Sequence, residues 1–370
     1  MAQAHDAFKR RRRQQAGFGL VEVMVGLAIG LIAILVMVQM IAFSNNQANI
    51  TSAGDDALNE GAIALYSLQS ELSQAGFGIA DLGILGCNLS LRSGVSVNVA
   101  PVTLNPDNIT GLGFSRDAAT DSFIVMYAKT NGAPLGDIVY GANNVMQTVS
   151  AFAVGDWVVS APATRTIPCN LTLDKVTALN GTTNAITLSS GSTLAIGSRL
   201  FNLGSSFRVA GFAVFNGNLS SCDYTNSGTD CTQAANWSPM AANIASMRLQ
   251  YGRETTAGAS MNGIVSLYDQ TSPDLSGATN AACSWIRIPG LRLALVARSV
   301  QGTASVTTTA PVWDGSFAGN PTASSVATPI DLSANASWQN YRYKVFQTTL
   351  PLRNITWVVS DPTWNGRSSC

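Results

Sequence analysis

Residues 17–22 of the chain read Gly-Phe-Gly-Leu-Val-Glu, and the interpretation of the whole sequence starts from this stretch. Five basic residues, Lys9 to Arg13, lie before it. An apolar run begins within it at Phe18 and continues to Phe43. As an α-helix with a rise of about 1.5 Å per residue, this run is long enough to cross a hydrocarbon core of about 30 Å. The sequence therefore predicts a membrane-spanning helix over residues 19–43 whose basic end faces the cytoplasm.

Glu22 is the only charged residue within this apolar run. An acidic side chain in the membrane costs about 2.5–3.5 kcal/mol even on the lenient insertion scale, and a plain signal anchor gains nothing from it. The run is also too long for a cleaved secretory signal. A carboxylate could instead pair with an amine on a neighbouring chain. If the chain is cut after Gly17, the amine of Phe18 is the new N-terminus, and Glu22 lies one helical turn away.

The basic leader, the Gly-Phe junction, the acid and the apolar run together resemble the prepilin processing site of type IV pilins and type II secretion pseudopilins. The resemblance implies that prepilin peptidase cuts on the cytoplasmic side after Gly17, the last leader residue. It also implies that Phe18 becomes the N-methylated mature N-terminus. Glu22 would then set the register of assembly by matching the amine of a neighbouring subunit. Residues 1–17 are accordingly treated as a leader peptide that takes no part in the fold.

The composition argues against several functions. The chain has 21 basic and 21 acidic residues, and its only histidine is His5. Without residues 1–17, 16 basic and 20 acidic residues remain, a net charge of about −4, which gives no support for nucleic-acid binding. A histidine-free mature chain lacks the commonest general base and a common zinc ligand. Because it also lacks the GxSxG, P-loop and HExxH motifs, we expect no enzyme activity, no metal and no cofactor.

All six cysteines follow the apolar run, so they are expected to lie in an oxidising compartment, where disulfides persist. Cys222 and Cys231 bracket a polar segment and are expected to pair with each other. Six cysteines allow many pairings, and the sequence leaves the remaining connectivity open. The other expected pairs are Cys87 with Cys169 and Cys283 with Cys370.

Helical periodicity continues beyond the apolar run and predicts one long helix over residues 18–76. The apolar stripe of its second half recurs every three or four residues and comprises Leu58, Ala62, Leu65, Leu68 and Leu72. We expect this stripe to pack on the protein's own globular part. Gly54 and Gly61 are expected soft points in the helix, and Gly76 is its expected C-terminal cap.

Residues 77–370, called the head below, read as antiparallel β structure because short apolar runs alternate with turn residues. The expected strands are residues 122–128, 157–160, 206–215, 247–251, 291–297 and 341–349. Asn216-Gly217 predicts a two-residue hairpin turn, since both residues tolerate positive φ. Alternation in residues 291–297 predicts one buried and one mixed face. The segment 129–205 is rich in turn residues and poor in charge, which favours two subdomains divided near residue 205.

A second resemblance lies in the order of short motifs along the head. Among them are Asp121-Ser-Phe-Ile-Val-Met-Tyr127, Met247-Arg-Leu-Gln-Tyr-Gly252 and Phe346-Gln-Thr-Thr-Leu-Pro-Leu-Arg-Asn354. Their succession is similar to that in the PilW group of large minor pilins and covers most of the mature chain. The loops 129–205 and 299–340 depart from the group. The resemblance implies an α+β, type IV pilin-like fold, in which a long N-terminal helix carries a large antiparallel β-rich head.

The two resemblances imply a minor pilin that helps to initiate assembly of type IV pili, the fibres of twitching motility. Its expected partners are other minor pilins, the major pilin, prepilin peptidase and inner-membrane lipid. The chain would cross the inner membrane once, with its head in the periplasm, and reach the cell surface at or near the pilus tip. The alternatives are a minor pseudopilin of type II secretion, which shares the N-terminal signals, and a membrane-anchored surface adhesin.

Overall fold

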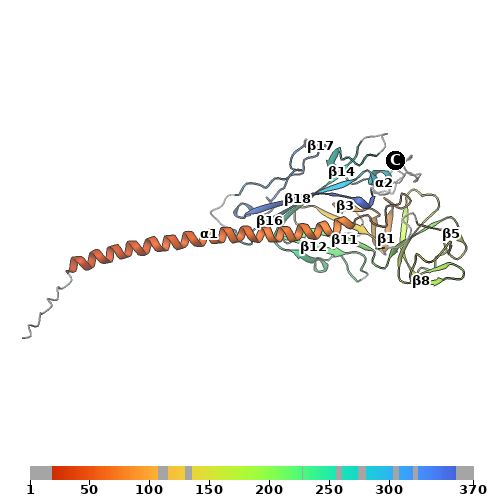
Figure 1. Cartoon of the computed structure of the whole chain (residues 1–370), viewed down its shortest axis with the longest axis horizontal. Helices are drawn as coiled ribbons and strands as arrows, with labels where there is room; N and C mark the ends of the chain where they lie inside the picture. The colour runs from red at the N-terminus through yellow and green to blue at the C-terminus, as the bar shows by residue number, and fades with distance from the viewer. Residues whose placement is uncertain are drawn as a thin grey trace, which may run out of the picture. The chain divides into compact units, whose positions relative to one another are not determined.

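The computed structural model describes residues 19–106, 116–129, 136–226, 228–255, 261–273, 281–302, 308–319 and 324–355. The chain divides into two compact units, Met1–Ser52 and Ala53–Cys370, which are described separately. The fold is α+β, with a long N-terminal helix, α1 (Leu20–Gln74), and a head of largely antiparallel β-sheets (Figure 1). Three of the predicted site residues, Gly17, Phe18 and Cys370, lie outside the described residues.

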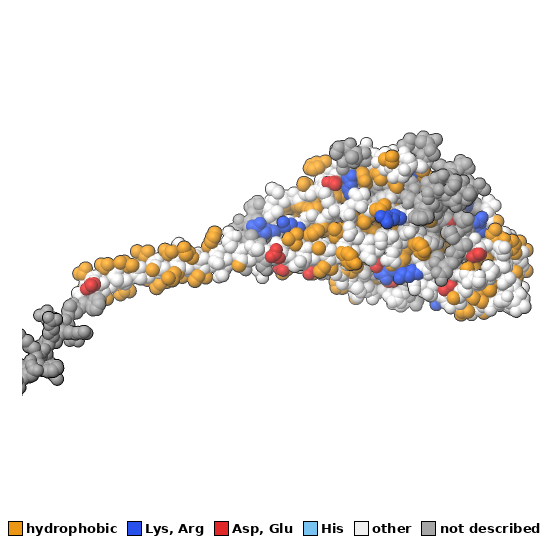
Figure 2. All heavy atoms as spheres, in the orientation of Figure 1, with side chains coloured by type: hydrophobic (Ala, Val, Ile, Leu, Met, Phe, Trp, Pro, Cys, Tyr) orange, Lys and Arg blue, Asp and Glu red, His pale blue; other side chains and the backbone are white. Residues whose placement is uncertain are grey.

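The first unit contains the beginning of α1. The Gly19 carbonyl accepts backbone hydrogen bonds from Glu22 (2.9 Å) and Val23 (3.2 Å), which close the first helical turn. Every residue from Leu20 to Asn45 is exposed, and hydrophobic side chains cover this part of the helix (Figure 2). Within the described ranges, Leu20–Asn45 is the one helical segment long and apolar enough to cross a membrane, with a mean hydropathy of 2.7.

The rest of α1 belongs to the second unit and lies against the head. Its buried positions are spaced by three or four residues and comprise Ala57, Gly61, Ala64, Leu68 and Leu72. The predicted stripe was therefore correct at Leu68 and Leu72 but wrong at Leu58 and Ala62, which are exposed. Small residues face the head in the first turns of this half because the helix packs closely there.

The C-terminal end of α1 is capped as predicted. Gly76 has φ +83°, the left-handed conformation that ends many helices. The side-chain amide of Asn354 donates hydrogen bonds to the carbonyls of Ser73 (3.3 Å) and Ala75 (3.0 Å). The last carbonyls of the helix are thus satisfied by a residue from the far end of the head.

A five-stranded antiparallel sheet, the β11 sheet, lies at the centre of the head in the order β13–β12–β11–β4–β3. Its strands are β3 (Val102–Leu104), β4 (Ser122–Tyr127), β11 (Arg208–Phe215), β12 (Asn218–Asp223) and β13 (Ser238–Ala241). The predicted hairpin turn joins β11 to β12, and Asn216 and Gly217 have φ values of 50° and 70°. The Phe123 and Phe212 rings stack across the sheet with centroids 5.0 Å apart.

A second five-stranded sheet, the β16 sheet, has the order β17–β15–β14–β16–β18. Its strands are β14 (Ile244–Arg253), β15 (Leu267–Asp269), β16 (Gly290–Arg298), β17 (Ser324–Ser325) and β18 (Tyr343–Pro351). One face of this sheet shares a core with α1 and the β11 sheet, in which Leu68, Phe212 and Leu293 are fully buried. In the described connections lie the short helices α2 (Ala281–Ile286), η2 (Ala234–Asn236) and η3 (Trp338–Asn340).

The mixed face predicted for residues 291–297 was wrong, because both faces of β16 are buried. Val296 packs in a separate cluster with Trp313 and Leu332. These covering residues come from the connection between β16 and β18, which supplies a second apolar layer on the outer face of the sheet.

The third sheet contains eight strands in the order β2–β1–β8–β7–β10–β5–β6–β9. They are β1 (Asn88–Arg92), β2 (Val95–Asn98), β5 (Asp137–Gly141), β6 (Val145–Met146), β7 (Trp157–Ala161), β8 (Asn170–Asn180), β9 (Ala185–Leu188) and β10 (Arg199–Gly204). Because β8 also pairs with β9, residues 137–204 close into a six-stranded ring around buried side chains such as Val158 and Leu200. The backbone N–H of Lys129 donates to the Leu203 carbonyl (3.2 Å), so the chain enters and leaves the ring at one place.

Candidate functional site

Of the residues predicted for processing and assembly, Glu22 is the one that lies in the described part of the chain. It lies in the first turn of α1 and is exposed. A carboxylate in this turn interacts favourably with the positive end of the helix dipole, by about 0.3–1 kcal/mol at an exposed site. No other charged residue occurs in the helix before Asp55. The arrangement therefore presents a single carboxylate, available to a cation from another molecule.

Hydrophobic side chains surround the helix after Glu22 on all faces. Leu27, Ile32 and Met37, for example, are 61%, 63% and 64% exposed. A helix that is apolar on every face is stable only in a membrane or against other apolar elements. This part of α1 is thus apolar enough to lie in a membrane or against other apolar helices, and Figure 2 shows the hydrophobic side chains along it.

Gly61 sets the distance between the second half of α1 and strand β18. A Cβ atom at this position would lie 2.0 Å from Cε2 of Phe346, far inside van der Waals contact. The sequence predicted a soft point in the helix at Gly61. The structure adds a packing role, because the missing side chain allows the helix backbone to meet the Phe346 ring directly.

Glu71 ties the polar side of α1 to the β11 sheet. The Tyr127 hydroxyl donates a hydrogen bond to its carboxylate at 3.0 Å, and the Arg208 guanidinium lies 3.4 Å from it. Arg208 also pairs with Asp223 at 3.3 Å. Burial, together with the neighbouring charge of Glu71, raises the pKa of Tyr127 to about 12. These contacts fix the rotation of this half of the helix on the head.

The sequence gives no local sign of this cluster. Its members are dispersed along the chain, and Tyr127 is 56 residues from Glu71. Acids and bases at such separations give no local pattern, so only the pairing of β4 with β11 brings Tyr127 beside Arg208.

Disulfides with both cysteines among the described residues join segments of the head at two places. One links Cys222 with Cys231, and the other links Cys87 with Cys169. These are two of the three pairs that the sequence analysis named. Cys283 is also disulfide-bonded, and Cys370, its expected partner, lies outside the described residues.

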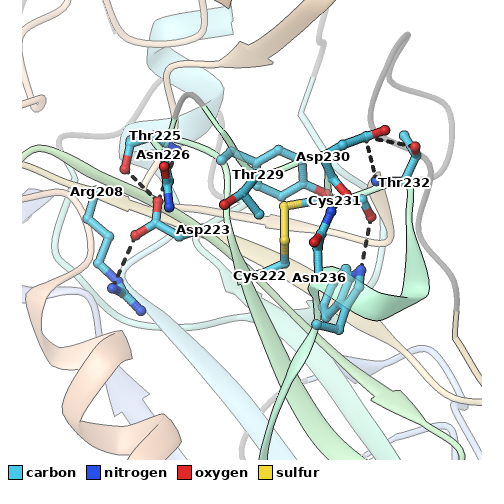
Figure 3. Close-up of a disulfide and its surroundings, with 12 residues drawn as sticks. Arg208, Cys222, Asp223, Thr225, Asn226, Thr229, Asp230, Cys231, Thr232 and Asn236 are labelled. Carbon is cyan, nitrogen blue, oxygen red and sulfur yellow. Dashed lines mark hydrogen bonds and ion pairs between the residues drawn. A yellow bond between two sulfur atoms is a disulfide. The ribbon is translucent and has the colours of Figure 1, made fainter.

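The polar loop closed by the Cys222–Cys231 disulfide is held by its own side chains (Figure 3). The Asp223 carboxylate accepts hydrogen bonds from Thr225, and the Asp230 carboxylate accepts them from Thr232. Figure 3 shows the two acids on opposite sides of the disulfide, so they do not form one cation site. Among the described residues, no group of three or more His, Cys, Asp or Glu side chains could hold a metal ion.

Two family models match the chain. The Type IV Pilus-assembly protein W model, PilW, matches residues 219–354, a range that runs from β12 past the end of β18. The prokaryotic N-terminal methylation motif matches residues 12–38, which include Gly17, Phe18 and Glu22. Both families consist of pilin structural and assembly proteins rather than enzymes. No curated protein and no solved structure matches the chain.

Proposed function

We propose that this chain, a type IV pilus protein of the PilW family, is a minor pilin that helps to initiate pilus assembly. The observation that carries the proposal is the difference in exposure between the two halves of α1. Residues from Leu20 to Asn45 are apolar and exposed, whereas Ala57, Leu68 and Leu72 are buried in the head core. One helix thus provides both an anchor available to lipid or neighbours and a spine for the head.

The N-terminal motif and the apolar helix fit an inner-membrane-anchored pilin. In the proposed pathway the chain crosses the membrane once, with its N-terminus in the cytoplasm and its head in the periplasm. Prepilin peptidase removes residues 1–17 by cutting after Gly17. The new amine of Phe18 is then methylated, and the mature helix extends over residues 18–76.

Glu22 then acts as the register group. Its membrane cost of about 2.5–3.5 kcal/mol is offset when a positive charge lies beside it. The terminal amine of a neighbouring subunit supplies that charge only when the two helices are aligned along their axes. Correct alignment is therefore favoured over other packings of the same apolar surfaces.

The head, residues 77–370, supplies the surfaces that meet other minor pilins and the major pilin at or near the pilus tip. We also propose that it has a type IV pilin-like fold with two subdomains, since β10 ends at Gly204 and β11 begins at Arg208. The PilW match over residues 219–354 supports a pilus role over a type II secretion role or a surface adhesin. No enzyme activity is part of the proposal.

A pair of N-terminal variants tests processing and assembly separately. Gly17→Ala is expected to block size reduction on immunoblots of membrane fractions, because the residue before the cleaved bond is changed. Glu22→Ala is expected to be cut normally but to be reduced about tenfold or more in sheared pili, since a tenfold change needs only about 1.4 kcal/mol of lost pairing.

Gln39→Ala is the matched control for Glu22→Ala, because Gln39 is an uncharged polar residue in the same apolar run. It should enter pili normally. Normal size reduction together with normal piliation in Gly17→Ala would contradict the processing step. Wild-type amounts of Glu22→Ala in sheared pili would show that the register role is wrong.

A further inference from the structure

A pocket of about 410 Å³ opens on the head beside the β11–β12 hairpin turn. It is lined by the turn residues Asn216 and Gly217, by Arg298 at the end of β16, and by side chains between Asp331 and Tyr343. Its volume lies within the range of about 300–1,000 Å³ that is usual for small-molecule sites. The assembly role proposed above for α1 does not use this pocket.

The walls of the pocket are held in place by the fold. The Asp117 carboxylate accepts hydrogen bonds from the backbone N–H groups of Asn216 (2.9 Å) and Gly217 (2.7 Å). Among the other lining residues, the Tyr343 hydroxyl donates to the Trp338 carbonyl (2.8 Å). A ligand would therefore bind with little loss of protein conformational freedom, which favours affinity.

Part of the pocket lining is apolar. Leu332 is buried and Trp338 is half-buried, and both belong to the cluster that covers the outer face of β16. The indole of Trp338 is thus supported from behind while part of it lines the pocket. A supported, partly exposed aromatic ring offers a flat apolar surface to a ligand.

The pocket lining also includes planar polar groups with unused hydrogen-bonding capacity. The Arg298 guanidinium stacks on Tyr341 at 4.9 Å, and within the described ranges it makes no side-chain hydrogen bond or ion pair. Asp331 is exposed, and one of its oxygens accepts a hydrogen bond from the Ser333 backbone (2.9 Å). Asn335 uses its oxygen in the same way, which leaves its NH₂ group for a ligand.

We propose that this pocket binds a neutral saccharide of one or two rings. Hydroxyl groups both donate and accept, so neighbouring hydroxyls can serve Arg298 and Asp331 together. The apolar face of a sugar ring fits against the indole of Trp338. An apolar ligand would bury both charged groups without partners, and an anionic ligand would meet the carboxylate of Asp331.

The binding test uses the full-length chain in detergent. The probes are an array of neutral hexose and N-acetylhexosamine oligosaccharides, with hexuronate oligosaccharides and short peptides for comparison. The tightest neutral probe is then titrated while tryptophan fluorescence is recorded. Asp331→Asn is expected to weaken binding about tenfold or more, because hydrogen bonds to a charged group are the stronger ones.

Asp230→Asn is the matched control. Asp230 is also exposed and also accepts a hydrogen bond from the backbone N–H two residues further on, but it lies in the disulfide loop. It should bind the probe like the wild type, and both variants should form pili normally, so failure here is distinct from failure of the assembly role. The inference is overturned if no neutral probe binds, if hexuronates or peptides are preferred, or if Asp331→Asn binds as tightly as Asp230→Asn.

Discussion

Replacing Gly61 with alanine tests how closely α1 packs on the head. The new Cβ would lie 2.0 Å from Cε2 and 2.5 Å from Cδ2 of Phe346, whereas carbon atoms pack best at about 3.5–4.0 Å. Overpacking of this kind costs about 1–3 kcal/mol. Alanine returns up to about 1 kcal/mol through its higher helix propensity. We therefore expect the free energy of unfolding of the second unit to fall by about 1–2 kcal/mol.

Gly54→Ala provides the comparison, because Gly54 lies in the same helix and a Cβ there has nothing within 4 Å. It gains the same helix propensity without the clash, so the unfolding free energy should rise by up to about 1 kcal/mol. The difference between the two variants isolates the contact with Phe346. It is measured by urea unfolding of the detergent-solubilised chain, followed by circular dichroism.

A double variant links the effect to the Phe346 ring. In a Phe346→Leu background, Gly61→Ala should cost less than it does alone, because the side chain that it strikes is smaller. If Gly61→Ala stabilises the chain as much as Gly54→Ala does, the close approach of α1 to β18 is refuted.

Two further predictions concern the buried polar groups of the head. Asp121→Ala removes the partner of Arg248, which lies 3.2 Å away in a site where both side chains are largely buried, so the unfolding free energy should fall by about 3–5 kcal/mol. The control Asp314→Ala changes an exposed residue and should alter the unfolding free energy by no more than about 0.5 kcal/mol. Equal urea midpoints for the two variants would contradict this prediction. Burial and then the charge of Glu71 raise the pKa of Tyr127 from 10.0 to about 12. Tyr127 therefore ionises first in the unfolded state, and the unfolding free energy should decline between about pH 10 and pH 12. Tyr127→Phe should flatten this decline in unfolding curves recorded across that range, and an unchanged dependence of the unfolding free energy on pH would rule out the contribution of Tyr127.

The parts of the fold that were predicted have local causes. The first half of α1 follows from an unbroken apolar run, and the hairpin turn follows from two residues that tolerate positive φ. Strand β4 was found because it is a continuous apolar run, and β16 was found because leucines alternate along residues 291–297. The packed face of the second half of α1 was predicted only in part. Leucine spacing identified Leu68 and Leu72, but near the start of this half the close approach at Gly61 places small residues against the head instead of Leu58.

The remaining misses have distant causes. The outer face of β16 is buried because Trp313, Ile330 and Leu332 cover it, and no alternation within the strand reveals this cover. The ring depends on strands as short as β6 and on pairings between distant segments such as β5 with β10, which have no local signature. The motif at Gly17–Glu22 could be recognised because its residues are contiguous, whereas the pocket at Arg298 is assembled from several separate segments.

The shared entry and exit of the ring has a consequence for the order of folding. Strands β4 and β11 pair side by side, yet 80 residues separate Tyr127 from Arg208. If the ring closes first, the hydrogen bond between Lys129 and Leu203 shortens that separation to about seven flexible residues. Loop-closure entropy scales as 1.5RT times the logarithm of loop length, so the entropic cost of pairing β4 with β11 falls by about 2 kcal/mol. The ring then acts as a local clamp that brings the two central strands of the head within reach of each other.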